Sequence, residues 1–309
     1  MTLGALAPAD LLPRLRGSGV CVTTGPFPLH VRIASAQAAE VFAALYRDYS
    51  LFPGDTIPLA RVRLSQPAGP RRWVRPKVDC TIDDEYPFDP LPLDHAFPLL
   101  KWGMNWCVAT RAHRYLMLHS AVVERGGAAM LLPAWTGSGK STLCAALIHR
   151  GWRYLSDEFA MVRLSDGLLA PVPRPLPLKN ESVGVIRAFA PEAVLGPVFR
   201  GTRKGDIAHV RPPEESVRRA GEPARPAWVV FPSYQPGAAL RLTPLPRSRS
   251  FLKMAGNSFN FQVLGAPAWH ALVGLVDSCD SYTLAYSDLD EAVACLGELV
   301  GGTVATETS

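Results

Sequence analysis

Residues 133–142 have the types and the spacing of a phosphate-binding loop, with the sequence Pro-Ala-Trp-Thr-Gly-Ser-Gly-Lys-Ser-Thr. An apolar run from Ala128 to Leu132 precedes them, and a helical pattern follows from Ser141. Glycines let successive backbone N–H groups turn toward an anion, and the N-terminus of the following helix adds a partial positive charge. This order of strand, loop and helix favours a nucleotide site.

Individual positions of the loop have expected roles. Lys140 would reach the β- and γ-phosphates, and the hydroxyl of Ser141 would be a ligand of Mg²⁺. The motif has Gly at position 134, where this chain has Ala134, which is small but restricts positive φ. The alternative is a glycine-rich turn that binds nothing. The residues expected to contact the nucleotide are Ala134, Trp135, Thr136, Gly137, Ser138, Gly139, Lys140, Ser141 and Thr142.

An acidic pair, Asp157-Glu158, follows Lys140 after one helix and the start of the next strand. A carboxylate at the end of the strand beside such a loop is where nucleotide hydrolases hold Mg²⁺. One carboxylate could stay ionised against the metal while the other accepts a proton from an attacking hydroxyl. The alternative is a solvated turn, but the distance of the pair from the loop favours function.

His119 is a further candidate, on the strand that precedes the loop's hairpin. A lone histidine in an apolar strand is usually a core residue. The hairpin could also return it to the side of the phosphate loop, so both roles stay open.

The order of these features resembles the HPr serine kinase/phosphorylase superfamily: His119, then the loop A-W-T-G-S-G-K-S, then S-D-E. The wider arrangement resembles the branch called HprK-related kinase A, through three further segments. These are Gly151 to Glu158, Arg174 to Ser182, and Lys204 to His209. The resemblance covers residues 111–309 and, before them, a T-G-P-F turn.

The resemblance implies a kinase fold related to phosphoenolpyruvate carboxykinase, with ATP and Mg²⁺ as cofactors. It implies that Ser141 and Asp157 hold the metal, that Glu158 is the general base, and that Glu181 adds to the metal site. His119 and Lys140 complete the expected catalytic residues. The superfamily has Asp and Arg where this chain has Glu158 and Val183, so HPr recognition and the reverse reaction are not expected to carry over. Candidate cations for the transferring phosphoryl group are Lys179, Lys204, Arg247 and Arg249.

The function expected from these residues is ATP-dependent phosphorylation of a hydroxyl, that of a serine, on a small protein or peptide. A peptide acceptor, together with a PqqD-like peptide-binding protein, is the partner that the resemblance implies. Two alternatives stay open: a kinase for a small metabolite, and a nucleotide-binding sensor without catalysis. Ala134 and Glu158 are the features that would fit the sensor.

Composition argues against a nucleic-acid-binding tail, a zinc or disulfide framework, and a membrane protein. The formal net charge is +5, and only six basic residues are lysines, which argues against a lysine-rich tail for nucleic acid. The six cysteines form no C-x-x-C pair, which favours free thiols rather than a zinc site or a disulfide framework. No signal peptide or membrane span is visible. We therefore expect a cytoplasmic protein without nucleic acid or membrane partners, and homo-oligomer formation stays open.

The pattern of strands and helices that must position these residues predicts an α/β fold. We expect a P-loop kinase domain over 111–309 and a smaller α+β domain over 1–110. The smaller domain is expected to help recognise the acceptor. Around the loop, strands are expected at 115–123, 128–132 and 159–164, with Gly151 ending the helix in a left-handed conformation. In the first part we expect strands at 20–24 and 29–33, a helix capped by Ser35, and a helix over 96–110 with its aromatic side chains in the core. Residues 201–224 are polar and predict a long loop. Further strands are expected near 228–231, 240–243 and 282–286, and helices near 249–257, 269–279 and 289–300.

Overall fold

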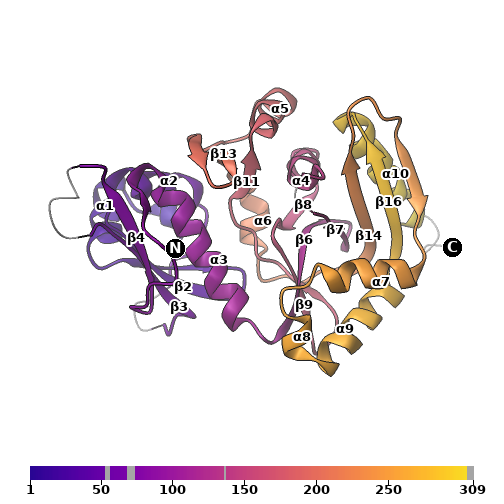
Figure 1. Cartoon of the computed structure of the whole chain (residues 1–309), viewed down its shortest axis with the longest axis horizontal. Helices are drawn as coiled ribbons and strands as arrows, with labels where there is room; N and C mark the ends of the chain where they lie inside the picture. The colour runs from indigo at the N-terminus through magenta and orange to yellow at the C-terminus, as the bar shows by residue number, and fades with distance from the viewer. Residues whose placement is uncertain (53–55, 68–73, 136, 305–309) are drawn as a thin grey trace. The chain divides into compact units, whose positions relative to one another are not determined.

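The computed structural model describes residues 1–52, 56–67, 74–135 and 137–304, with side chains up to residue 302. The chain is mixed α/β and divides into two compact units (Figure 1). The first unit contains Met1–Ala112, Pro177–Asn180 and Val194–Arg219. The second contains His113–Leu176, Glu181–Ala193 and the chain from Ala220 onward. The sequence alone suggested one boundary at residue 110 and did not indicate that two later segments pack with the first unit.

The first unit is built on a five-stranded sheet. Its strands, in spatial order, are β1 (Val20–Thr24), β2 (Phe27–Ile33), β3 (Ala60–Ser65), β4 (Lys77–Ile82) and β5 (Leu91–Pro92). Along β2 the burial alternates strictly, so Leu29, Val31 and Ile33 face the core. The predicted strands at 20–24 and 29–33 are confirmed, and they pair as an antiparallel hairpin.

Helices cover this sheet: η1 (Leu3–Ala5), α1 (Pro8–Arg16), α2 (Ala36–Leu45), η3 (Leu93–His95) and α3 (Ala96–Arg111). The hydroxyl of Ser35 accepts the N–H of Ala38 at 3.3 Å, which confirms the predicted cap of α2. The prediction that the aromatic residues of α3 lie in the core is only partly right. Trp102 is half-buried and Trp106 is 46% exposed, because the buried face of α3 is formed by its aliphatic residues and Phe97.

A small sheet in the order β11 (Leu176–Lys179), β13 (Gly205–Val210) and β12 (Phe199–Thr202) completes the first unit, followed by α6 (Glu214–Arg218). The prediction of a long loop over 201–224 was wrong. Asn180 accepts the N–H of Asp206 at 3.0 Å through its side chain and donates its own N–H to the carbonyl of Asp206 at 2.8 Å. Pairing with a distant strand, rather than a local apolar pattern, orders this segment.

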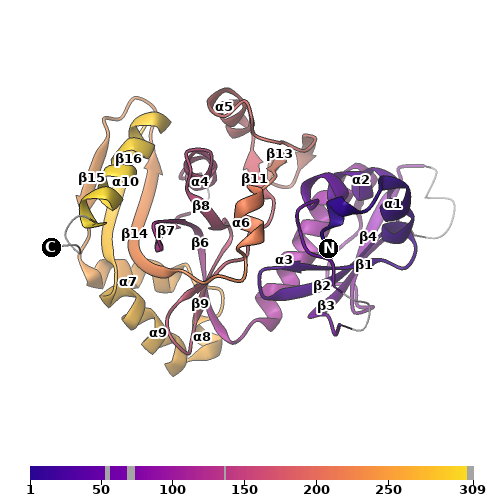
Figure 2. The ribbon, with the colours of Figure 1, turned by 180° about the vertical axis from the view of Figure 1, so that it is seen from behind.

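The second unit contains a mixed eight-stranded sheet (Figure 2). The order is β10 (Leu169–Ala170), β9 (Phe159–Arg163), β6 (Tyr115–Arg125), β7 (Ala128–Pro133), β14 (Arg225–Tyr234), β16 (Asp280–Tyr286) and β15 (Arg241–Pro244), and β8 (Arg153–Ser156) also pairs with β6. Strands β7, β14 and β16 run parallel, whereas β6 is antiparallel to β7. The three parallel strands therefore end at the same edge of the sheet.

Helices cover both faces of this sheet. Figure 1 shows α7 (Arg247–Gly256), α8 (Phe261–Leu264) and α9 (Ala266–Asp277) grouped together, and they form a core with one face of the strands. Helix α4 (Lys140–Ile148) contacts β6 and β7, α10 (Leu289–Val304) contacts β16 and α4, and α5 (Glu181–Phe189) packs on α4. Because both faces are covered, strands such as β7 are almost entirely apolar.

The structure also bears on the predicted state of the cysteines and on membrane-spanning helices. All six cysteines are free, as predicted; five are buried and Cys295 is half-buried. Among the described residues, no helix has the length and hydropathy required to cross a bilayer.

Candidate functional site

The predicted order of strand, loop and helix is confirmed, since β7 ends at Pro133 and α4 begins at Lys140. Gly137 and Gly139 both have left-handed φ angles, +91° and +82°. Glycine reaches such angles without the steric cost that a Cβ imposes. Ala134 is buried and Trp135 is 68% exposed, while Thr136 lies outside the described residues. Ser141 and Thr142 are half-buried in the first turn of α4.

Two tyrosines hold the helix end of the loop, and neither was found from the sequence. The hydroxyl of Tyr286 donates to the carbonyl oxygen of Gly139 at 3.2 Å, and the backbone N–H of Tyr234 donates to the carbonyl of Ser138 at 3.0 Å. Tyr234 and Tyr286 are direct partners at the ends of β14 and β16, with ring centroids 5.8 Å apart. A phosphate loop at the carboxyl edge of parallel strands is the common place for a ligand in α/β sheets.

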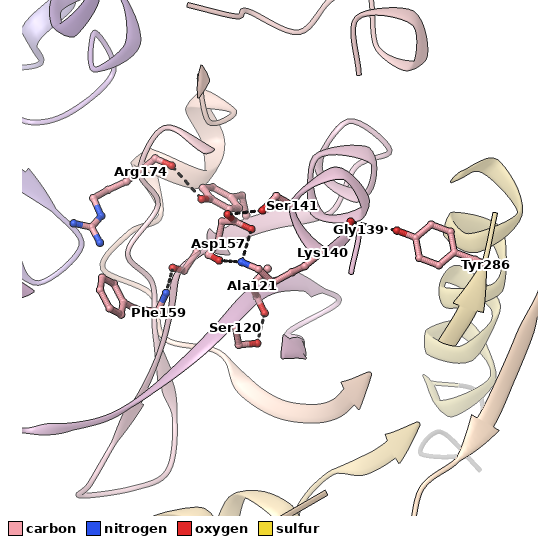
Figure 3. A network of polar contacts seen from close by, with 11 residues as sticks. Ser120, Ala121, Gly139, Lys140, Ser141, Asp157, Phe159, Arg174 and Tyr286 are labelled. Carbon is pink, nitrogen blue, oxygen red and sulfur yellow. Dashed lines mark hydrogen bonds and ion pairs between the residues drawn. The ribbon is translucent and has the colours of Figure 1, made fainter. Parts of the chain in front are cut away.

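Asp157 connects the two reactive side chains of the loop (Figure 3). The ammonium of Lys140 lies 3.0 Å from Oδ1 of Asp157 and also donates to the backbone carbonyl of Asp157. The hydroxyl of Ser141 donates to Oδ2 of the same carboxylate at 2.9 Å. Lys140 is 8% exposed and Asp157 is 3% exposed, so this ion pair is largely withdrawn from water. The structure thus brings together three residues that the sequence predicted to form one site.

The ionisation of Asp157 is balanced between opposing effects. Burial has the largest effect and raises the pKa of its carboxyl group, and the charge of Glu158 raises it further. The charge and hydrogen bond of Lys140, and the hydrogen bond from Ser141, lower the pKa. The net direction is upward. A cation beside Asp157, whether Lys140 or a metal, favours the ionised carboxylate that a hard metal requires.

His119 lies directly opposite Phe159 in the antiparallel pairing of β6 with β9. Phe159 follows Glu158, so the histidine is a cross-strand neighbour of the residue after the acidic pair. The ring of Phe259 lies 5.7 Å from that of His119 and 5.0 Å from that of Phe159, and Phe259 is 49% exposed. Phe259 therefore limits the positions of the His119 ring. This residue was not predicted, because it lies in a bend far from the motifs.

Arg174 is a cation near the acidic pair that was not predicted. It is buried, its guanidinium carbon lies 5.4 Å from the centroid of the Phe159 ring, and Nη1 has no hydrogen-bond partner among the described residues. Its carbonyl accepts the hydroxyl of Tyr154 at 3.0 Å (Figure 3). The segment Arg174 to Ser182 was noted for its resemblance, but the arginine itself was not singled out.

Other candidates are not joined to this cluster. Glu181 is exposed at the first position of α5, and in the described part of the chain no hydrogen bond or ion pair links it to Asp157 or Ser141. Arg247 lies in the exposed first turn of α7 and forms an ion pair with Asp277 at 3.7 Å, and Arg249 is exposed in the same turn. Lys179 and Lys204 belong to the first unit.

The residues present fit a magnesium nucleotide better than a metal alone. The hydroxyl oxygen of Ser138 is buried and has no hydrogen-bond partner among the described residues, and a Cβ built on Gly137 would meet no atom within 4 Å. The described residues contain no group of three or more His, Cys, Asp or Glu that could hold a metal ion. Mg²⁺ commonly takes only one or two protein oxygens and completes its shell with phosphates and water. Ser141 and Asp157 supply such a pair.

Comparisons with known proteins add no assignment: no family model matches the chain, and no curated protein matches it.

Proposed function

We propose that the protein is an ATP- and Mg²⁺-dependent kinase of the HPr serine kinase-like type, which transfers the γ-phosphate to a hydroxyl, that of a serine, on a peptide or small protein. The observation that carries the proposal is the shared carboxylate of Asp157, which accepts Lys140 and Ser141 at the first turn of α4. A structural glycine turn would not require a buried lysine, a buried aspartate and a serine hydroxyl converging at one point. A phosphate loop that binds Mg²⁺ requires all three.

Different residues of the loop would bind the phosphates and the metal. The backbone N–H groups around Gly137 and Gly139 and the N-terminus of α4 would bind the phosphates, and Lys140 would exchange contacts with Asp157 for contacts with phosphate oxygens. Ser141 and Asp157 would hold the metal. The bound magnesium nucleotide supplies the phosphoryl group and the charge that balances it. Positioning and charge stabilisation, rather than covalent chemistry, are what a protein contributes to such a transfer.

Glu158 is the proposed general base, because it is half-buried beside Asp157 and its charge acts on that carboxylate. It would accept the proton of the acceptor hydroxyl as the oxygen attacks. His119 is placed near it through the pairing with Phe159. Arg174, buried beside Phe159 in the same unit, is the proposed cation for stabilising the transferring phosphoryl group. The partners proposed with this function are a peptide acceptor and a PqqD-like peptide-binding protein, in the cytoplasm.

The test is transfer from γ-labelled ATP to proteins and peptides in lysate from the source cell. We expect a labelled species with the wild type, and none with Lys140→Ala. Glu158→Gln should retain ATP binding and lose about 10²–10⁴-fold in transfer rate, the usual contribution of a general base. Glu291→Gln, at an exposed position of α10, is the matched control and should transfer normally.

Two results would count against the proposal. Labelling that is unchanged in Lys140→Ala would show that another protein is responsible. Intact ATP binding without transfer to any acceptor would favour the nucleotide sensor.

A further inference from the structure

The first unit contains an apolar pocket that the proposed kinase chemistry does not use. Its volume is about 170 Å³. One wall comes from β5, η3 and the first half of α3, and the other from the end of β12 and the turn that follows it. The lining residues are Leu91, Pro92, His95, Pro98, Trp102, Gly201, Thr202 and Arg203. A cavity of about 150 Å³ lined by apolar side chains holds a benzene molecule, so this pocket has room for one leucine or phenylalanine side chain.

Hydrogen bonds within the first unit connect the two walls of the pocket and order the second wall. The imidazole Nε2 of His95 lies 2.8 Å from the carbonyl oxygen of Arg200, and the Thr202 hydroxyl donates to the carbonyl of Gly205 at 2.6 Å. The β12–β13 turn is thus fixed against the end of η3. A pocket whose walls are already held binds a ligand without a large ordering cost.

The rim of the pocket is basic. Arg200, Arg203 and Lys204 are all exposed, and the ammonium of Lys204 lies 5.5 Å from the centroid of the Trp102 ring. Of the nearby carboxylates, that of Asp206 accepts the N–H of Gly201 at 2.9 Å, and Asp94 is exposed beside His95. Within the lining segments, residues 91–95 and 200–206, these three cations outnumber the two carboxylates of Asp94 and Asp206.

We propose that this pocket is a docking site for an acidic peptide, which inserts one leucine- or phenylalanine-sized side chain against Trp102 and places flanking carboxylates on Arg203 and Lys204. An apolar anchor supplies affinity through burial, and the charged rim selects the partner and speeds its approach. The inference concerns binding alone and does not depend on phosphate transfer.

The test is fluorescence anisotropy of the full-length protein, without nucleotide, against labelled synthetic peptides. The probe is a short peptide with one central leucine flanked by glutamates. We expect saturable binding that weakens with salt, and a loss of about 10–100-fold when the leucine is replaced by serine. A peptide with lysines in place of the glutamates should not bind.

Two pairs of variants locate the site. Trp102→Ala removes the aromatic wall and should weaken binding of the probe, while Trp106→Ala, which alters an exposed tryptophan of the same helix outside the lining, should not. Arg203→Glu reverses a charge at the rim and should weaken binding, while Arg241→Glu, at an exposed position of β15, should not. Because Arg203 is exposed, its variant should fold even if Trp102→Ala does not.

The proposal would be overturned by a leucine–glutamate probe that does not bind, by equal binding of the lysine peptide, or by equal binding to all four variants. It would also be overturned if the wild type self-associated in sedimentation and Arg203→Glu abolished that association without changing probe binding. That result would assign the surface to a second copy of the chain.

Discussion

The hydroxyl of Tyr286 donates to the carbonyl oxygen of Gly139 at 3.2 Å, and the same carbonyl accepts the N–H of Leu143 within α4 at 2.9 Å. The tyrosine therefore fixes the peptide at which the phosphate loop becomes a helix. Tyr286→Phe keeps the ring and removes this hydrogen bond. A bond of this kind is worth about 0.5–1.5 kcal/mol, so we expect ATP to bind about 2–10-fold more weakly, as measured by calorimetry. Tyr282→Phe, on the same strand, is the control. Equal affinity in Tyr286→Phe and wild type would show that the bond does not support the loop.

Gly139 tolerates no side chain. Its φ angle is +82°, and a Cβ there would lie 2.5 Å from the Tyr286 hydroxyl and 2.8 Å from Cβ of Tyr234. Gly139→Ala should abolish ATP binding because the loop has to move. Gly126→Ala is the matched control, since Gly126 also has a positive φ, +63°, but open space around it. Both variants carry backbone strain of about 1 kcal/mol, and only the first should lose the nucleotide. Retained binding in Gly139→Ala would contradict the role of the tyrosines.

Lys140→Met should destabilise the protein in a pH-dependent manner. Without its cation, Asp157 has a folded pKa further above its ordinary value of 3.8, because burial then acts without the compensating charge. A carboxyl group whose pKa is raised by folding contributes stability at low pH, and this contribution is lost as pH rises through the folded pKa. The free energy of unfolding, from urea titration, should fall by as much as about 3–5 kcal/mol at pH 8 and by less at pH 5. Lys77→Met, an exposed lysine of β4, should change it little at either pH. A loss that is the same at pH 5 and pH 8 would rule out an uncompensated Asp157 as the cause.

Ser141→Ala should raise the Mg²⁺ concentration needed for half-maximal phosphate transfer by about 10–100-fold, since it removes a proposed metal ligand that is also bonded to Asp157. Thr110→Ala is the control, because it removes an exposed hydroxyl in the last turn of α3, outside the proposed site. Glu181→Gln in the same assay decides whether the glutamate predicted from the resemblance is a metal ligand. An unchanged Mg²⁺ requirement in Ser141→Ala would remove this serine from the site.

His209 should make the protein acid-sensitive. Burial, and then the charge of Lys101, hold the pKa of His209 well below 6.5, and the ring packs edge-on against Phe97 with centroids 5.1 Å apart. A histidine whose pKa is lowered by folding contributes stability above its unfolded pKa, and this contribution is lost as pH falls below about 6.5. We expect the free energy of unfolding to decrease by up to about 1.4 kcal/mol per pH unit between pH 6.5 and pH 5.

The His209→Leu variant should show a flatter dependence in that window, and His270→Leu, at an exposed position of α9, should show the wild-type slope. The measurement is urea unfolding at a series of pH values. The same slope in His209→Leu and wild type would assign the acid sensitivity to other groups.

Local signals in the sequence were sufficient for the elements around the loop. The strand predicted at 128–132, the left-handed Gly151 and the serine cap at Ser35 are decided within a few residues, and all three are found in the structure. The convergence of Lys140, Ser141 and Asp157 was also predictable, because a strand, a helix and the next strand leave few ways to arrange three such residues.

The pairing of strands that are far apart in the chain could not be predicted from local sequence. Tyr234 and Tyr286 end ordinary apolar strands, and nothing local indicates that these strands lie parallel to the strand of the phosphate loop. The segment 201–224 looked like a loop because its order depends on Asn180, which contacts it from outside. In each case the missing information is which strands are neighbours in the sheet, and this is set by the whole core.

The hydrogen bond between Gly139 and Tyr286 joins residues that are 147 positions apart in the chain. A ribosome adds about 5–20 residues per second, so roughly 7–30 s pass between synthesis of the loop and synthesis of the tyrosine that holds it. During that interval the nascent chain carries residues 133–142 without β16. The support that Tyr286 gives to the loop is thereby postponed until β16 has been synthesised and has paired with β14.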